Sequence, residues 1–138
     1  MNRLLSFLLA AILFSCNSAE KKFDTDNYEK NKETLEEKEK KNPQMFLVVT
    51  GHDKKNLIGQ RVIRGTIMNK ASVCTYKDVQ LKISFFSKTG VLLEENKETV
   101  YEIVQPNNSV KFKTKYFSPK GTDSVSIVVI SAKPEEKK

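Results

Sequence analysis

From residue 44 onward, apolar and polar residues tend to alternate along the chain. The clearest example is the segment VQLKISF at residues 79–85, in which every second residue is apolar. Successive side chains of a β-strand point to opposite faces of a sheet, so this pattern predicts a strand with one buried face. Related patterns predict further strands at residues 45–50, 61–69, 91–101, 110–116 and 125–130. No helical period follows residue 43.

Short turn sequences separate the predicted strands. Residues 87–90 (SKTG) are typical of a hairpin turn, in which the glycine adopts a positive φ. Residues 105–108 and 118–121 each contain proline together with asparagine or glycine. Six or seven short strands joined by such turns predict an all-β fold, a small Ig-like antiparallel β-sandwich over residues 44–132. The C-terminal residues, 133–138, are expected to form a charged, disordered tail.

The N-terminal segment has a different pattern. Arg3 precedes an apolar run at residues 4–14 that is interrupted only by Ser6. As a helix this run extends about 16 Å, roughly half of the ~30 Å hydrocarbon core of a bilayer. We therefore interpret residues 1–15 as a secretory signal peptide and not as a membrane-spanning helix.

Residues 16–43 contain few apolar side chains and many charged ones. Such a segment buries too little surface to offset the entropy lost on ordering. Glu36 with Lys40 and Glu37 with Lys41 are spaced to form i,i+4 pairs, which favours transient helix over residues 28–41. Leu35 is the single large apolar residue near these pairs, so no apolar stripe is present to dock such a helix. The sequence predicts a flexible, charged tether.

Charge is concentrated in the predicted sandwich. The whole chain carries a net charge of +7, and its segment 44–132 holds thirteen basic and seven acidic residues, a net +6. A positive domain favours anionic partners, although charge of this kind also serves solubility.

Lysines gather on one face of a predicted strand. Lys111, Lys113 and Lys115 share a face because side chains two residues apart point the same way. Lys82 and Arg64 are also predicted to face outward from their strands. We interpret these five residues as a candidate face for an anionic polymer, an anionic small ligand or an acidic protein. The alternative is a solvated face whose edge lysines block unwanted strand pairing.

Strict alternation places two aromatic residues, Phe86 and Phe117, on the polar faces of their strands. If both side chains lay on one face of the sandwich, they would form a contact patch. A β-bulge would instead turn either side chain inward.

Residues suited to catalysis are sparse. His52 is the single histidine, and it is expected in an exposed loop beside Asp53 with no second ligand or orienting partner evident. Glu94 and Glu98 share a face of one predicted strand, where pairing with lysines is as suitable a role as acid–base chemistry. No nucleophile or phosphate-loop motif is present. We predict no catalytic residue, metal site or cofactor.

The end of the leader resembles a known processing signal. Residues 13–16 (LFSC) are similar to the bacterial lipobox, in which cleavage occurs before an acylated cysteine. The resemblance implies that Cys16 becomes the lipid-modified first residue of the mature protein and anchors it in the membrane. Residues 17–18 lack the aspartate associated with inner-membrane retention, which favours the outer membrane. Cys74 then has no disulfide partner and is expected to be a semi-buried small hydrophobe, the alternative being a Cys16–Cys74 bridge.

Part of the predicted sandwich resembles a known domain family. Residues 62–70 (VIRGTIMNK) are similar to the opening strand of bacterial FxLYD-type Ig-like domains, with the pattern hydrophobic-x-Gly-x-hydrophobic-x-Asn. Residues 79–90 resemble the second signature of that family, with Phe86 and Ser87 in place of Tyr and Asp. The resemblance covers roughly residues 58–132. It implies a secreted β-sandwich with a binding or structural role and brings no catalytic residue.

Together these features predict a monomeric lipoprotein of the bacterial cell envelope, with its domain in the periplasm or at the cell surface. Its expected partners are membrane lipid through acylated Cys16 and an envelope protein or anionic glycan. Export makes nucleic acid an unsuitable partner. The leading interpretation is a non-catalytic binding or scaffolding module. The first alternative is a receptor for an anionic envelope polymer or small ligand through the lysine-rich face, and the second is an envelope hydrolase that uses His52.

Overall fold

The computed structural model describes residues 33–136 of the chain. The predicted signal peptide at residues 1–15, the lipidation site Cys16 and the tether up to residue 32 lie outside the described residues. Within the described part, no helix is long and apolar enough to cross a bilayer.

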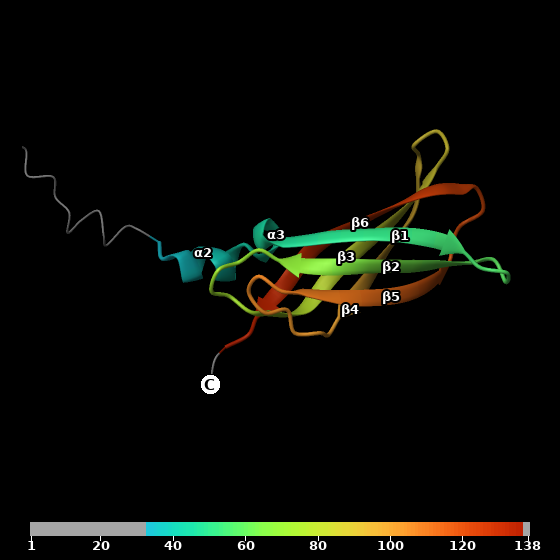
Figure 1. The fold of residues 1–138 in the computed structure, drawn as a ribbon. Helices are drawn as coiled ribbons and strands as arrows, with labels where there is room; N and C mark the ends of the chain where they lie inside the picture. The colour runs from blue at the N-terminus through green and yellow to red at the C-terminus, as the bar shows by residue number, and fades with distance from the viewer. Residues whose placement is uncertain (1–32, 137–138) are drawn as a thin grey trace, which may run out of the picture. The chain divides into compact units, whose positions relative to one another are not determined.

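The described chain forms two packed antiparallel sheets, which are the two layers visible in Figure 1. The strands are β1 (Leu47–Lys55), β2 (Gln60–Asn69), β3 (Tyr76–Ser87), β4 (Leu92–Val100), β5 (Ser109–Phe117) and β6 (Thr122–Pro134). The first sheet has the order β1-β2-β5 and the second the order β4-β3-β6. This arrangement confirms the prediction of a small all-β sandwich.

The core lies between the sheets and is built from the alternating positions. In β3 the side chains of Leu81, Ile83 and Phe85 are fully buried, as the period of two predicts. Ile63 and Ile67 of β2 face them from the first sheet and are also fully buried. Alternate residues of β2 and β3 therefore face the core.

Backbone conformation at the turns agrees with the sequence. Gly90 and Gly121 have φ values of +81° and +89°, in the left-handed region that glycine adopts without strain. Asn107 adopts a φ of +58°, which asparagine tolerates better than most residues. The hairpin turn of residues 87–90 is closed by a 2.9 Å hydrogen bond from the Gly90 N–H to the Ser87 carbonyl.

The asparagine that ends β2 is a buried hub. Asn69 is fully buried, and its Nδ2 donates to the carbonyls of Cys74 at 2.8 Å and Val104 at 2.9 Å. Its Oδ1 accepts from the Ala71 N–H at 2.8 Å. The side chain thus satisfies polar backbone groups of two loops that follow different strands.

The C-terminus differs from the expected disordered tail at residues 133–138. Strand β6 continues to Pro134, and the Glu135 N–H donates to the Thr75 carbonyl at 2.8 Å. An ion pair of 2.7 Å joins Glu135 to Lys77. Strand pairing with β3 therefore orders a stretch that its composition alone predicts to be solvated.

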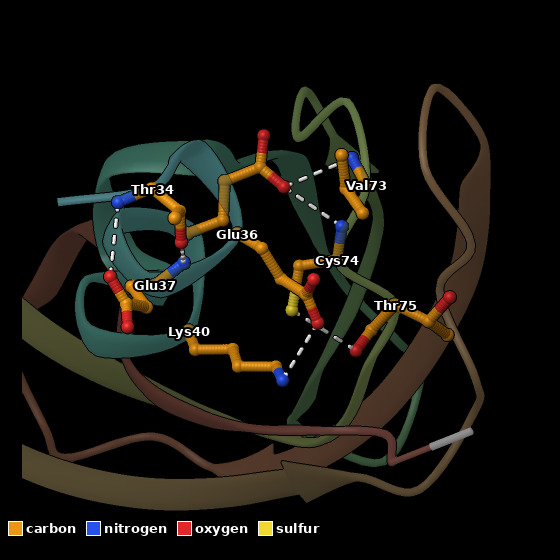
Figure 2. A network of polar contacts seen from close by, with 8 residues as sticks. Thr34, Glu36, Glu37, Lys40, Val73, Cys74 and Thr75 are labelled. Carbon is orange, nitrogen blue, oxygen red and sulfur yellow. Dashed lines mark hydrogen bonds and ion pairs between the residues drawn. The ribbon is translucent and has the colours of Figure 1, made fainter. Parts of the chain in front are cut away.

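The described end of the predicted tether is helical. Helix α2 spans Leu35–Lys41 and the short helix α3 spans Pro43–Phe46, so the N-terminal part of the predicted strand at residues 45–50 is helix. A capping box between Thr34 and Glu37 begins α2. Figure 2 shows this cap together with the predicted ion pair between Glu36 and Lys40, which measures 2.8 Å. Lys41 pairs with Glu33 at 2.5 Å and not with Glu37, the partner that the spacing predicts.

A carboxylate docks α2 against the sandwich, where the sequence predicts no docking. The side chain of Glu39 is 1% exposed and accepts three hydrogen bonds of 2.7–3.0 Å from the backbone N–H groups of residues 72–74. The Tyr76 hydroxyl donates to the Glu39 carbonyl at 2.7 Å. Figure 2 shows Val73 and Cys74 beside the helix. A polar contact replaces the apolar stripe, so residues 33–43 belong to the folded unit.

Candidate functional site

Basic side chains form a grid on the outer face of the first sheet. In β2 the side chains of Ile63 and Ile67 are buried, so Arg64 between them points outward. Pairing between strands places Arg64 between His52 of β1 and Lys113 of β5. Three basic residues thus form one row across the sheet.

Two further outward rows flank this one. The row on one side is Thr50, Thr66 and Lys111, and the row on the other is Lys54, Val62 and Lys115. Each flanking row therefore adds at least one lysine. We call the basic side chains of the three rows the basic face, which consists of His52, Lys54, Arg64, Lys111, Lys113 and Lys115.

The basic face carries no compensating acid. No aspartate or glutamate occupies an outward position of β1, β2 or β5. Among the ion pairs of residues 33–136, none includes a side chain of the basic face. Asp53 follows His52 in sequence, but it pairs with Arg61 and not with the face. Like charges directly opposite each other in a sheet are destabilising, so we expect the Arg64–Lys113 pair to lower the stability of the fold.

Two glycines on the inner side bring the strands of this sheet close to the core. Gly51 and Gly65 lie opposite each other in β1 and β2. A Cβ atom at Gly65 would lie 2.6 Å from ring atoms of Phe112, and one at Gly51 would lie 2.9 Å from Cδ1 of Ile127. The outer surface above these glycines is a shallow hollow of about 630 Å³, lined by side chains of two adjacent outward rows.

The five predicted face residues divide between the two sheets. Arg64 and the three lysines of β5 lie together, but Lys82 lies on β3 in the second sheet. Lys82 also has an acidic partner, Glu95, at 3.4 Å. Lys82 therefore does not share a face with the other four residues, contrary to the prediction from the sequence. Two members were missed, His52 and Lys54, because strand pairing brings β1 beside β2.

The histidine does not lie in a loop. His52 and Asp53 are part of β1, and the His52 side chain is exposed between Thr50 and Lys54 on the basic face. Its partner across the strands is Arg64, a cation. No cluster of three metal-binding side chains occurs within residues 33–136.

Exposed apolar side chains border one end of the basic face. The hairpin that joins β1 to β2 carries Leu57, which is fully exposed, and Ile58, which is 70% exposed. Phe117 is also 70% exposed and lies opposite Gln60, at the base of this hairpin. A second hollow of about 440 Å³ connects Leu57 with the adjoining side chains of the basic face.

The two aromatic residues on polar strand faces do not meet. Phe117 ends β5 in the first sheet, whereas Phe86 lies in β3 of the second sheet, beside a β-bulge. Phe86 is also half-buried. The two side chains therefore form no common contact patch.

The two candidate carboxylates of β4 have separate partners. Glu98 accepts hydrogen bonds from the hydroxyls of Thr114 at 3.1 Å and of Tyr116. Burial, followed by the contact with Glu98, raises the pKa of Tyr116 to about 12. Glu94 accepts instead from the side-chain amide of Asn96 at 2.6 Å. Glu98 thus links the edges of the two sheets.

Cys74 lies under the N-terminal helix. Its side chain is 4% exposed, and burial raises the pKa of its thiol. The backbone N–H of Cys74 donates to Glu39 at 2.8 Å. Cys74 therefore packs as a small buried residue, while its backbone holds α2.

The basic face is suited to binding anions. Lysine and arginine side chains donate charge-assisted hydrogen bonds to phosphate and carboxylate groups, and several of them on one surface act together. Comparison of the chain with known protein families, with curated proteins and with solved structures finds no match.

Proposed function

We propose that this protein is a lipid-anchored, non-catalytic binding module of the bacterial cell envelope, and that its basic face binds an anionic partner. The observation that supports the proposal most strongly is the row His52–Arg64–Lys113, in which basic residues lie directly opposite one another with no acidic residue on the face. Opposite charges directly across a sheet stabilise the pair, whereas like charges destabilise it. An anionic partner removes this repulsion when it binds.

The dimensions of the face favour an extended partner over a single small anion. Positions two residues apart along a strand are separated by about 6.6 Å, and neighbouring strands by about 4.8 Å. Three rows across three strands therefore spread the cations over an area of roughly 13 Å by 10 Å. This spacing matches several anionic groups presented together, as on a polymer or a surface.

The proposed anchor supports the same role. The lipobox-like sequence at residues 13–16 implies acylation of Cys16, and sixteen residues separate Cys16 from the first described residue, Glu33. Attachment to a membrane confines the domain near envelope components and raises their effective concentration. The FxLYD-like strand at residues 62–70 also favours a binding or structural domain.

Binding of a soluble polyanion tests this function. The full-length lipidated protein, held in zwitterionic detergent, is titrated with polyphosphate and with polygalacturonate at increasing NaCl. The double variant Arg64→Gln/Lys113→Gln is expected to bind roughly tenfold more weakly and to show a shallower salt dependence. The matched control is Lys88→Gln/Lys120→Gln, which removes two charges from exposed turns. Equal weakening of polyanion binding in both double variants contradicts the proposal. So does a lack of polyanion binding by the lipidated protein without substitutions.

A further inference from the structure

The hairpin between β1 and β2 projects apolar side chains beside the cations of the basic face. We propose that this hairpin tip, residues 56–59, inserts into the headgroup region of an anionic phospholipid bilayer while the basic face lies on the lipid headgroups. The inference rests on the proposed function, because it names a lipid surface as the anionic partner.

The tip is a projection whose shape is held by its own hydrogen bonds. The Asn56 side-chain oxygen accepts from the N–H of Ile58 at 3.1 Å and of Gln60 at 2.9 Å. Gly59 adopts a φ of +83°, which closes the turn. Leu57 and Ile58 are thereby held in solvent, and no described part of the chain covers them. Exposed apolar surface that is rimmed by polar residues is typical of an interaction site.

Charge and apolar residues are ordered as contact with a membrane surface requires. Lys54 and Lys55 immediately precede the tip, and Lys115 lies beside Val62 on the neighbouring strand. Aliphatic side chains enter the boundary between headgroups and acyl chains, while neighbouring lysines remain at the anionic headgroups. The 440 Å³ hollow joins Leu57 to the cations of the face, so the apolar and basic parts form one continuous surface.

A soluble anionic polymer would engage only half of this surface. It would neutralise the lysines of β5 but leave Leu57, Ile58 and Phe117 in water. A bilayer with anionic headgroups engages both parts at once. The tip lies at the opposite end of the sandwich from α2 (Figure 1). Because the basic face is the outer face of a sheet, joint contact by the tip and this face lays the strands along the membrane.

The chain contains no tryptophan, which allows a single reporter to be placed at the tip. The full-length lipidated protein carrying Leu57→Trp is reconstituted into vesicles of phosphatidylcholine, with and without phosphatidylglycerol. We expect a blue shift of tryptophan emission, and quenching by brominated lipid, only in the anionic vesicles. The control reporter, Val128→Trp, lies on the outer face of the second sheet and is expected to remain unquenched in both.

The outcomes separate this inference from the proposed function. An unquenched tip reporter in anionic vesicles, together with intact binding of polyphosphate, overturns insertion and leaves anion binding by the basic face. Equal quenching of both reporters overturns the proposed orientation. If the protein does not bind polyphosphate but its tip reporter is quenched in anionic vesicles, the proposed function of the basic face is overturned. The tip then acts as an apolar anchor alone.

Discussion

The ring of Phe112 occupies the space in which a side chain at position 65 would lie. Phe112 and Gly65 are direct partners across β5 and β2, and a Cβ at Gly65 would approach the ring to 2.6 Å and would also meet the Thr50 carbonyl. The glycine in the FxLYD-like pattern thus has a packing reason in this fold. Because glycine has no side chain, the Phe112 ring can pack at this position and close the core under the basic face.

Replacing this glycine is expected to overpack the core. Gly65→Ala should lower the free energy of unfolding by about 1–3 kcal/mol, because backbone and ring must both shift. Thermal and denaturant unfolding measure the effect. Thr66→Ala, which changes the outward position next along β2, serves as the control and should change stability by less than about 0.5 kcal/mol. An unchanged stability of Gly65→Ala would show that Phe112 moves without cost.

The buried hub at the end of β2 gives a second prediction. Asn69→Leu should destabilise the domain by about 2–4 kcal/mol, because it leaves the carbonyls of Cys74 and Val104 without a side-chain donor. Chemical denaturation followed by circular dichroism measures the loss. Asn96→Leu, at a partly exposed asparagine of β4, is the comparison and should have a smaller effect.

Docking of α2 should depend on pH through Glu39. Burial alone would raise the pKa of this carboxyl, but the hydrogen bonds from the backbone of residues 72–74 outweigh burial and hold the pKa below 4.5. A pKa that is lower in the folded state contributes stability that is present above the unfolded value. That contribution is lost as the pH falls through the folded value.

We therefore expect α2 to detach in acid, at a pH below the usual carboxyl value of 4.5, while the sandwich persists. Glu39→Gln should reduce stability at neutral pH, by about 2–3 kcal/mol for loss of charge-assisted hydrogen bonds, and should flatten the acid dependence. Hydrogen exchange of the α2 amides between about pH 7 and pH 3 measures helix docking. Glu36→Gln changes an exposed carboxylate of the same helix and is expected to retain the acid dependence.

The basic face should trade stability for binding. Lys113→Gln removes a cation opposite Arg64, so we expect the free energy of unfolding to rise by about 0.2–1 kcal/mol at low salt and by less in about 1 M NaCl. The same change should weaken polyanion binding. Stability is measured by denaturant titration at both salt concentrations. A loss of stability at low salt would mean that Lys113 has a stabilising partner and is not repelled by Arg64.

The hairpin tip should affect membrane contact without affecting the fold. Leu57→Ser/Ile58→Ser removes apolar surface that is exposed. The thermal unfolding midpoint is therefore expected to stay within about 2 °C of the midpoint of the protein without these substitutions. Transfer of the domain onto anionic vesicles should fall roughly tenfold, as measured by vesicle flotation of the Cys16→Ser protein produced without residues 1–15. Unchanged flotation would indicate that lysines alone hold the domain on lipid.

Local pattern determined much of this fold. The alternation at residues 79–85 predicted the buried face of β3, and the glycines at positions 90 and 121 marked turns with positive φ. The common orientation of Lys111, Lys113 and Lys115 also follows from the period of two in a strand. These features depend on neighbours in sequence, so they are readable without a structure. The lipid anchor at Cys16 and the envelope location stay predictions from the leader sequence.

Strand pairing and long-range contacts decided the rest. Arg64 joins the lysines of β5 and Lys82 does not, because β2 pairs with β5 while β3 lies in the other sheet. Glu39 docks α2 on backbone N–H groups more than thirty residues away, which no periodicity marks because any sequence carries such groups. Which side chains share a strand face follows from their spacing along the chain. Which faces meet depends on how the two sheets bury their apolar sides together, and that requires contacts between distant segments.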